Sequence, residues 1–341
     1  MTSSAKRVVL ASRPNGEPKT SDFRIEDYEV PTPGEGQVLL RTIWLSLDPY
    51  MRGRMSDGPS YAAPVPVGGT MEGGTVAEVI SSNSPDFAGG DVVLAHSGWQ
   101  THGVADGKTL RKIDPALGPV STAVGVLGMP GMTAYTGLLD IGQPKAGETV
   151  VVAAASGAVG SAVGQIAMIK GARAVGIAGG KDKCDYVKNE LGFADCIDHR
   201  DSDFAAKLKA ACPDGIDVYF ENVGGAVFEA VFPLLNAFAR VPVCGLIAQY
   251  NDTADTSPPW AGKMLRNVLT KRLTIRGFIV SDFAGRRQEF LRDMSAWVKA
   301  GKVKYKEFVT EGLDSAPEAF MGLLKGKNFG KQLVRVGPDK A

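Results

Sequence analysis

The sequence has 341 residues, of which 44% are hydrophobic, and its formal net charge at pH 7 is +1. This length allows two domains, each able to bury a core. The near-zero charge argues against nucleic acid or a membrane surface as the partner. No apolar run approaches a membrane-spanning length, and the first residues lack the pattern of a signal peptide. The four cysteines are far apart and form no C-x-x-C pair, so we expect neither a zinc lobe nor disulfides, and we predict a cytoplasmic protein.

The N-terminal third, residues 7–110, consists of short apolar segments separated by proline and glycine. This spacing is typical of an antiparallel, barrel-like unit and not of alternating strands and helices. The loop 57–69 is rich in proline and glycine, and together with the irregular segment 246–262 it is a candidate to line a substrate cleft.

The segment 150–164 predicts a strand, a tight turn and a helix. The turn reads Ala155-Ser156-Gly157-Ala158-Val159-Gly160, in which the two glycines let the backbone approach a pyrophosphate and the helix start faces the phosphates. The alternative is a glycine-rich turn without a ligand. A second apolar run, 174–178, follows at the distance expected for a β-α-β unit. We therefore predict a Rossmann fold, a doubly wound parallel sheet.

The nucleotide type is indicated by the end of the second strand, which reads Gly179-Gly180-Lys181-Asp182-Lys183. An NAD-binding site needs an acidic residue at the strand tip, whereas a 2′-phosphate needs a cation. Two lysines stand here, and His199-Arg200 end the next short strand. The alternatives are that the lysines are solvated and that Asp182 turns toward the ribose. We predict NADP(H) as the cofactor.

Two later strands carry specific expectations. Pro242 lies in the apolar run 241–245 and is unfavourable in a central strand. A short strand at 273–276 is predicted to lie at an exposed sheet edge, which invites pairing with a second copy of the chain.

The sequence gives little support for a metal site or for a catalytic serine. The three histidines, His96, His102 and His199, do not have the spacing of zinc ligands. There is no G-x-S-x-G motif, and Ser156 lies in the phosphate turn. We expect no bound metal.

Six motifs together give a resemblance over nearly the full chain. The sequence resembles the medium-chain dehydrogenase/reductase superfamily and, within it, the zinc-independent, NADP-dependent alkenal/one reductases, a group with prostaglandin reductases and curcumin-reductase-like proteins. The motifs are Leu47-Asp48-Pro49-Tyr50-Met51-Arg52, Gly128-Met129-Pro130-Gly131-Met132-Thr133-Ala134-Tyr135, Ala154-Ala155-Ser156-Gly157-Ala158-Val159-Gly160, Glu221-Asn222-Val223-Gly224-Gly225, Gly277-Phe278-Ile279-Val280 and Gly326-Lys327-Asn328-Phe329-Gly330-Lys331.

The resemblance implies an α/β fold with a discontinuous GroES-like β-barrel catalytic domain, residues 1–128 and 301–341, and a Rossmann NADP-binding domain, residues 129–300. It implies a homodimer, because relatives pair their Rossmann sheets edge to edge. It also explains the missing metal ligands: the zinc enzymes carry Cys at 47–48 and Gly-His-Glu at 70–72, where this chain has Leu47-Asp48 and Thr70-Met71-Glu72.

The same resemblance assigns site residues. The phosphates lie over the glycine turn, and the 2′-phosphate lies near Lys183, with His199 where a tyrosine is usual. Tyr250 and Tyr50 face the substrate as candidate catalytic residues. The implied cofactor-binding residues are Met132, Thr133, Gly157, Ala158, Val159, Gly160, Lys183, His199, Asn222, Phe278, Val280 and Asn328.

The implied reaction is hydride transfer from NADPH to the β-carbon of an α,β-unsaturated aldehyde or ketone. Charge develops on the carbonyl oxygen and needs a hydrogen-bond donor. Tyr250 and a cofactor ribose hydroxyl are the candidate donors. The alternative for Tyr250 is a packed tyrosine whose hydroxyl bonds the backbone. The alternative functions are a quinone oxidoreductase of the same fold and a non-catalytic NADPH-binding protein.

Overall fold

The computed structural model describes residues 4–58, 60–253 and 261–339 and divides into two compact units. Unit 1 comprises residues 1–128 and 307–341, and unit 2 comprises residues 129–306. The sequence-based boundary lies six residues earlier, at 300/301. Residues 301–306 group with unit 2 because Gln165 hydrogen-bonds both the carbonyl oxygen and the amide of Lys304, each at 2.8 Å.

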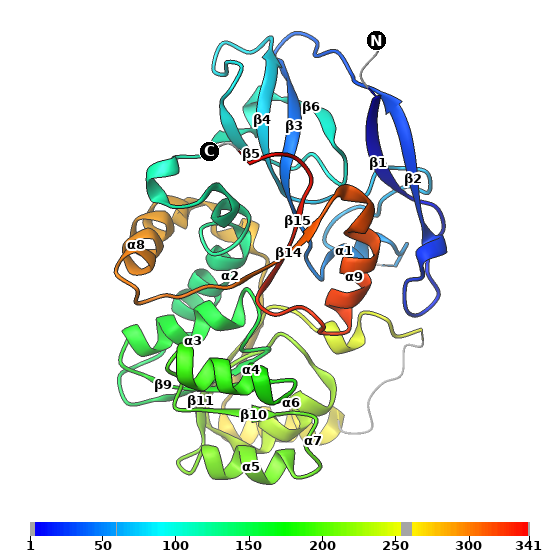
Figure 1. Cartoon of the computed structure of the whole chain (residues 1–341). Coiled ribbons are helices and arrows are strands. Elements are labelled where there is room, and N and C mark those ends of the chain that lie inside the picture. Colours follow the sequence, from blue (N-terminus) through cyan, green and yellow to red (C-terminus); the bar gives the residue numbers. More distant parts are fainter. Residues whose placement is uncertain (1–3, 59, 254–260, 340–341) are drawn as a thin grey trace. The chain divides into compact units, whose positions relative to one another are not determined.

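Unit 1 is a mostly antiparallel β structure built from both ends of the chain. Its main sheet has the order β14-β15-β3-β4-β5-β7, with β6 also paired to β3, and β1 and β2 form a separate antiparallel pair. In Figure 1 the blue strand β3 lies beside the red strand β15, with which it pairs antiparallel. The strands are β1 (Ser4–Leu10), β2 (Phe23–Glu29), β3 (Gln37–Ser46), β4 (Thr75–Ser82), β5 (Val92–Ala95), β6 (His102–Asp106), β7 (Arg111–Lys112), β14 (Glu307–Glu311) and β15 (Lys331–Arg335).

The core of unit 1 gathers aromatic and aliphatic side chains beneath two helices, α1 (Met51–Arg54) and α9 (Ala316–Leu324). Trp99 is fully buried, stacks on Phe23 and packs edge to face against Phe320 of α9. Large aromatic side chains contribute most of the apolar area that such a core removes from water. The core therefore ties the C-terminal helix to the N-terminal strands.

Unit 2 contains a parallel sheet of six strands in the order β10-β9-β8-β11-β12-β13. The first strand in sequence, β8, lies near the centre, which is the arrangement of a doubly wound sheet. Its five residues are all buried, as expected of a strand covered by helices on both faces. The strands are β8 (Thr149–Ala153), β9 (Arg173–Ala178), β10 (Asp195–Asp198), β11 (Ile216–Phe220), β12 (Leu235–Val243) and β13 (Thr274–Gly277).

The helices of unit 2 alternate with these strands, so that the sheet is wound by successive β-α-β crossovers (Figure 1). They are α2 (Met129–Thr136), α3 (Gly160–Ile169), α4 (Lys181–Asp185), α5 (Phe204–Ala211), α6 (Gly225–Val231), α7 (Ala261–Lys271) and α8 (Arg287–Lys299). Among the described residues no helix has the length and apolar character to cross a bilayer.

Pro242 lies inside β12, between β11 and β13, where proline is uncommon. Its carbonyl oxygen accepts a hydrogen bond from the amide of Glu221 at 3.0 Å. In a parallel strand the amide and carbonyl of one residue face the same neighbour. The missing amide of Pro242 therefore faces β11, and the pairing continues past it, because the amide of Cys244 donates to the carbonyl oxygen of Glu221 at 2.9 Å.

Candidate active site

The turn between β8 and α3 has the close packing that a dinucleotide site requires. A Cβ atom on Gly160 would lie 2.3 Å from the carbonyl oxygen of Ala154, so only glycine lets the helix start this near the strand. Gly157 donates to the same oxygen at 2.9 Å, and Ala154 itself has a positive φ of 53°. The turn is tight enough to present the start of α3 to an anion.

Ala155 stands where the usual fingerprint has its first glycine, and the neighbouring strand accommodates it. A Cβ on Gly176 of β9 would lie 2.8 Å from the Cβ of Ala155. The absent side chain of Gly176 therefore makes room for the methyl group of Ala155, which is fully buried. The substitution preserves the turn instead of abolishing it.

Two basic side chains from the end of β10 lie over the Gly179-Gly180 turn at the end of β9. A Cβ on Gly179 would be 2.9 Å from His199 Nε2 and 3.1 Å from Arg200 Nε. Lys183 lies nearby on α4: partial burial and then the charge of Arg200 lower its pKa. Partial desolvation and then Arg200 likewise lower the pKa of His199. A 2′-phosphate bound here would offset the repulsion by Arg200 that lowers both pKa values.

Of the acidic residues near this turn, Asp198 is bound to the backbone. Asp198 Oδ1 accepts the amide of Arg200 at 3.0 Å. Although desolvation opposes it, the pKa of Asp198 is lowered by hydrogen bonds from the backbone amides of Gly180 and Arg200. Asp182 is exposed at the start of α4. The carboxylate of Asp198 thus shapes the turn that carries His199 and Arg200.

Asn222 follows β11 and reaches across to the neighbouring strand, where its Nδ2 donates to Ala153 O at 2.8 Å. The preceding Glu221 is buried, and its Oε1 accepts the amides of Val223 and Gly224 at 2.6 and 2.9 Å. Burial raises the pKa of Glu221, against the lowering effect of these amides. Glu221 therefore fixes the loop that presents Asn222 beside the glycine turn.

Met132 and Thr133 lie on α2 and are largely buried. The hydroxyl of Thr133 donates to Met129 O, one turn earlier, at 2.8 Å. Phe278 follows β13, and its ring packs edge to face against Phe220 and Phe283. Because this ring is buried, any cofactor contact at 278 falls to the main chain, with Val280 next in the segment.

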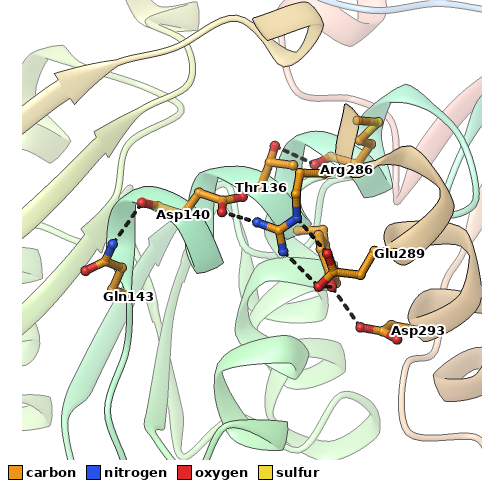
Figure 2. Close-up of polar contacts among 8 residues, drawn as sticks. Thr136, Asp140, Gln143, Arg286, Glu289 and Asp293 are labelled. Carbon is orange, nitrogen blue, oxygen red and sulfur yellow. Dashed lines mark hydrogen bonds and ion pairs between the residues drawn. The ribbon is translucent and has the colours of Figure 1, made fainter. Parts of the chain in front are cut away.

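A polar network holds the segment after Phe278 to α2 and to the π-helical segment η5 (Gly137–Gly142) that follows α2 (Figure 2). Arg286 forms an ion pair with Asp140 and a two-pronged contact with Glu289, at 2.8 and 3.0 Å. The buried hydroxyl of Tyr135 on α2 lies 3.0 Å from Glu289 Oε1 and 2.8 Å from Asp293 Oδ2, and these two carboxylates share its one hydrogen. Burial, followed by these carboxylates, raises the pKa of Tyr135, so that it remains a donor. The network gives the 278–286 segment a fixed support.

Tyr250 lies at the end of a short 3-10 helix, η8 (Ile247–Gln249), and is half-buried. Its hydroxyl oxygen accepts the amide of Leu246 at 3.3 Å. This is the backbone contact that the alternative interpretation of Tyr250 describes. In that bond the oxygen is the acceptor, which is compatible with donation of the hydroxyl hydrogen to a substrate oxygen. Part of the 246–262 loop, residues 254–260, lies outside the described residues.

Tyr50 and Asn328 belong to unit 1, where a buried ion pair links the segments that carry them. Lys331 Nζ lies 2.6 Å from Asp48 Oδ1 and donates to Leu47 O at 2.9 Å. Asp48 precedes Pro49-Tyr50, and Lys331 follows Asn328, whose Nδ2 donates to Gly330 O. Desolvation, then the nearby acids Asp48 and Glu72, raise the pKa of Tyr50, which keeps it a neutral phenol.

Sequence reasoning missed Glu221 and the Asp48–Lys331 pair as supporting residues. All three stand inside or beside motifs that were recognised, at Glu221-Asn222, Asp48-Pro49-Tyr50 and Asn328-Phe329-Gly330-Lys331. A charged residue within an otherwise apolar motif was the available signal, because a buried charge needs a partner.

Comparison with known proteins agrees with this geometry. A family model described as the N-terminal domain of oxidoreductase matches residues 6–113, and one described as zinc-binding dehydrogenase matches residues 158–299. NADPH-dependent curcumin reductase of Escherichia coli (strain K12) is 56% identical over 336 residues, covering 98% of this chain and 97% of that protein. 2-Alkenal reductase (NADP(+)-dependent) of Nicotiana tabacum is 42% identical over 344 residues, covering 98% of each.

A solved structure with bound NADPH is also similar to this chain. The crystal structure of CurA from Vibrio vulnificus in complex with NADPH superposes with a TM-score of 0.94 at 52% identity, covering 98% of this chain and 100% of that one. The fold and the site thus define an oxidoreductase with an α/β fold. The chain belongs to the medium-chain dehydrogenase/reductase family, in the group of the curcumin and alkenal reductases.

The predicted α/β fold, a parallel Rossmann sheet with a mostly antiparallel GroES-like domain, is confirmed. Although one family model is named for zinc, the described part of the chain holds no group of three or more His, Cys, Asp or Glu side chains placed for a metal ion. The residues do fit a dinucleotide, since the Gly160 contact, the glycine turn and the basic side chains of Lys183, His199 and Arg200 lie at the strand ends where one binds.

Proposed function

We propose that this protein reduces the C=C bond of α,β-unsaturated aldehydes and ketones with NADPH. The observation that carries the cofactor half of this proposal is the cluster of Lys183, His199 and Arg200 over the Gly179-Gly180 turn. The reaction half is supported by the relatives named as curcumin and alkenal reductases.

When bound, NADPH supplies a hydride. Gly157 to Gly160 provide the close turn for the diphosphate, and Asn222, held by Glu221 and Ala153, orients the nicotinamide side together with the 278–280 main chain. Met132, Thr133 and Asn328 complete the cofactor-binding set. Tyr250 donates a hydrogen bond to the carbonyl oxygen of the substrate as charge develops there, and Tyr50 faces the substrate as a second neutral donor.

The bond that is reduced can be identified directly. With a simple enone and NADPH deuterated at the transferred position, we expect a saturated ketone with deuterium at the β-carbon. An enolate spreads charge between carbon and oxygen, so a phenol is a sufficient donor for it. An allylic alcohol with deuterium at the carbinol carbon would contradict the proposal, and faster turnover of a quinone in a parallel assay would favour a quinone oxidoreductase. NADPH binding without turnover of any electrophile would indicate a non-catalytic protein.

Lys183→Ala is expected to weaken NADPH binding about tenfold or more and to leave NADH binding nearly unchanged. One charge-assisted hydrogen bond to a phosphate contributes about 1.5–3 kcal/mol, and NADH lacks that phosphate. Isothermal titration of both nucleotides measures the effect. Lys181→Ala is the matched control, because Lys181 is exposed and paired with Asp185. Equal loss of NADPH and NADH affinity would count against this assignment.

We propose a homodimer formed at the β13 edge. Leu265 and Leu269 lie one turn apart on α7 and are 63% and 76% exposed, while Met264 and Val268 of the same helix pack on the core. Ile275 of β13 is also exposed, and an uncovered apolar edge favours pairing with its copy.

Sedimentation velocity at micromolar concentration is expected to show a dimer, and Leu269→Glu is expected to shift it toward monomer. Ile80→Glu, at an exposed position on β4 of unit 1, is the control and should leave the dimer intact. A monomeric wild-type protein would contradict the proposal.

A further inference from the structure

Arg54 on α1 is a buried arginine that the proposed reaction does not use. Only 4% of the residue is exposed. Its Nε lies 2.5 Å from Glu72 Oε1, and its NH1 donates to Ser60 Oγ at 3.0 Å and more weakly to Ala62 O at 3.4 Å. Burying a guanidinium costs free energy unless its contacts compensate, so these contacts define what the residue holds in place.

Two tyrosines share this guanidinium. The ring centroid of Tyr61 lies 4.5 Å from Arg54 Cζ, and that of Tyr50 lies 5.6 Å away. Both distances are within the range of a cation–π contact. Tyr61 is 61% exposed, so Arg54 supports the inner side of a ring that is otherwise open to solvent. Arg54 therefore connects a proposed substrate-facing tyrosine, Tyr50, to the 57–69 loop.

The loop depends on α1 along this stretch. The amide of Val65 donates to the carbonyl oxygen of Arg54 at 2.8 Å, and the loop end is held separately by Gly68 and Gly69 bonding to Leu10. Between Arg54 and Val65, the side chain of Arg54 reaches Ser60, Tyr61 and Ala62 in succession. A planar fork that also stacks on aromatic rings is specific to arginine, because lysine offers a point charge without the fork.

We propose that Arg54 is a positioning residue that sets substrate specificity by fixing residues 60–65, with Tyr61, against Tyr50. This rests on the proposed reductase function. Because the outer side of the Tyr61 ring is open to solvent, we expect it to contact the outer part of a large substrate and not the reacting atoms, so that the effect falls on bulky substrates.

The test compares a small enal with a bulky aryl enone in steady state. Arg54→Met retains the length of the side chain and loses its contacts with Glu72, Ser60 and both rings. We expect the KM for the bulky enone to rise about tenfold, with the KM for the small enal and the Kd for NADPH changed less than about threefold. Arg54→Lys keeps the buried charge beside Glu72 and serves if the methionine variant does not fold; it is expected to raise the same KM several-fold.

Arg52→Met is the matched control on the same helix. Arg52 is equally buried, and its guanidinium bonds Ser56 Oγ at 2.7 Å and Gly16 O at 2.9 Å. It should lower thermal stability while leaving the ratio of the two KM values unchanged. If the wild-type enzyme reduces both substrates and Arg54→Lys or Arg54→Met keeps the wild-type ratio, the inference is wrong. If the wild-type enzyme reduces neither substrate, the proposed function itself fails.

Discussion

Replacing Tyr250 by phenylalanine is expected to lower kcat for enone reduction about a hundredfold and to leave NADPH binding nearly unchanged. The phenol is proposed to donate to the carbonyl oxygen in the transition state, and removal of one such donor typically costs a factor of about 10² or more. Because the ring and its position in the turn after η8 are retained, the loss falls on turnover and not on folding. Stopped-flow measurement of NADPH oxidation at saturating enone separates the chemical step from binding.

Tyr50→Phe is the matched comparison. Tyr50 is also a neutral phenol, since burial and neighbouring acids raise its pKa. If the catalytic donor is Tyr250, the effect of Tyr50→Phe should appear mainly in the KM for the enone. A Tyr250→Phe variant with wild-type kcat would instead mean that the hydroxyl of Tyr250, which accepts the amide of Leu246, takes no part in the chemical step. In that case a large loss of kcat in Tyr50→Phe would move the donor role to Tyr50.

The parts of the fold and site that sequence reveals are those determined locally. The strand, glycine turn and helix at 150–164 could be predicted because the steric need for Gly160 arises from its own turn, at Ala154. The position of the basic side chains beside the nucleotide turn was also predictable, since the ends of neighbouring parallel strands lie together. Lys183 and His199 follow β9 and β10, whose register pairs Asp198 with Ala178.

What the sequence did not reveal depends on distant partners. Nothing local indicates that Gly176 makes room for Ala155, that Arg54 contacts Tyr61 and Glu72 together, or that Lys331 pairs with Asp48 across 283 positions. Pro242 shows the reverse case: a local rule disfavours it in a central strand, yet the strand pairing continues around it, through its carbonyl oxygen to Glu221 and from the amide of Cys244 to the same residue. Tertiary context decides each of these positions.

Lys331→Met is expected to destabilise the protein by about 3–5 kcal/mol, because it leaves the carboxylate of Asp48 buried without its counter-ion. The two side chains are 5% and 8% exposed. A loss of this size is a large fraction of the 5–15 kcal/mol that typically separates folded from unfolded states. Urea unfolding followed by circular dichroism measures it. Arg335→Met is the control: Arg335 pairs with Glu311 at the surface, where 46% and 63% of the side chains are exposed, and should cost less than about 1 kcal/mol.

The double variant Asp48→Asn/Lys331→Met distinguishes the pair from its individual charges. Once both charges are removed no buried ion remains uncompensated, so the double variant should be more stable than the sum of the two single losses predicts. Additive losses would contradict direct pairing. This pair joins the segment before Tyr50 to the segment after Asn328. Lys331 also donates to Leu47 O, and this hydrogen bond is absent from every variant without the lysine. The double variant should therefore regain stability without regaining full activity.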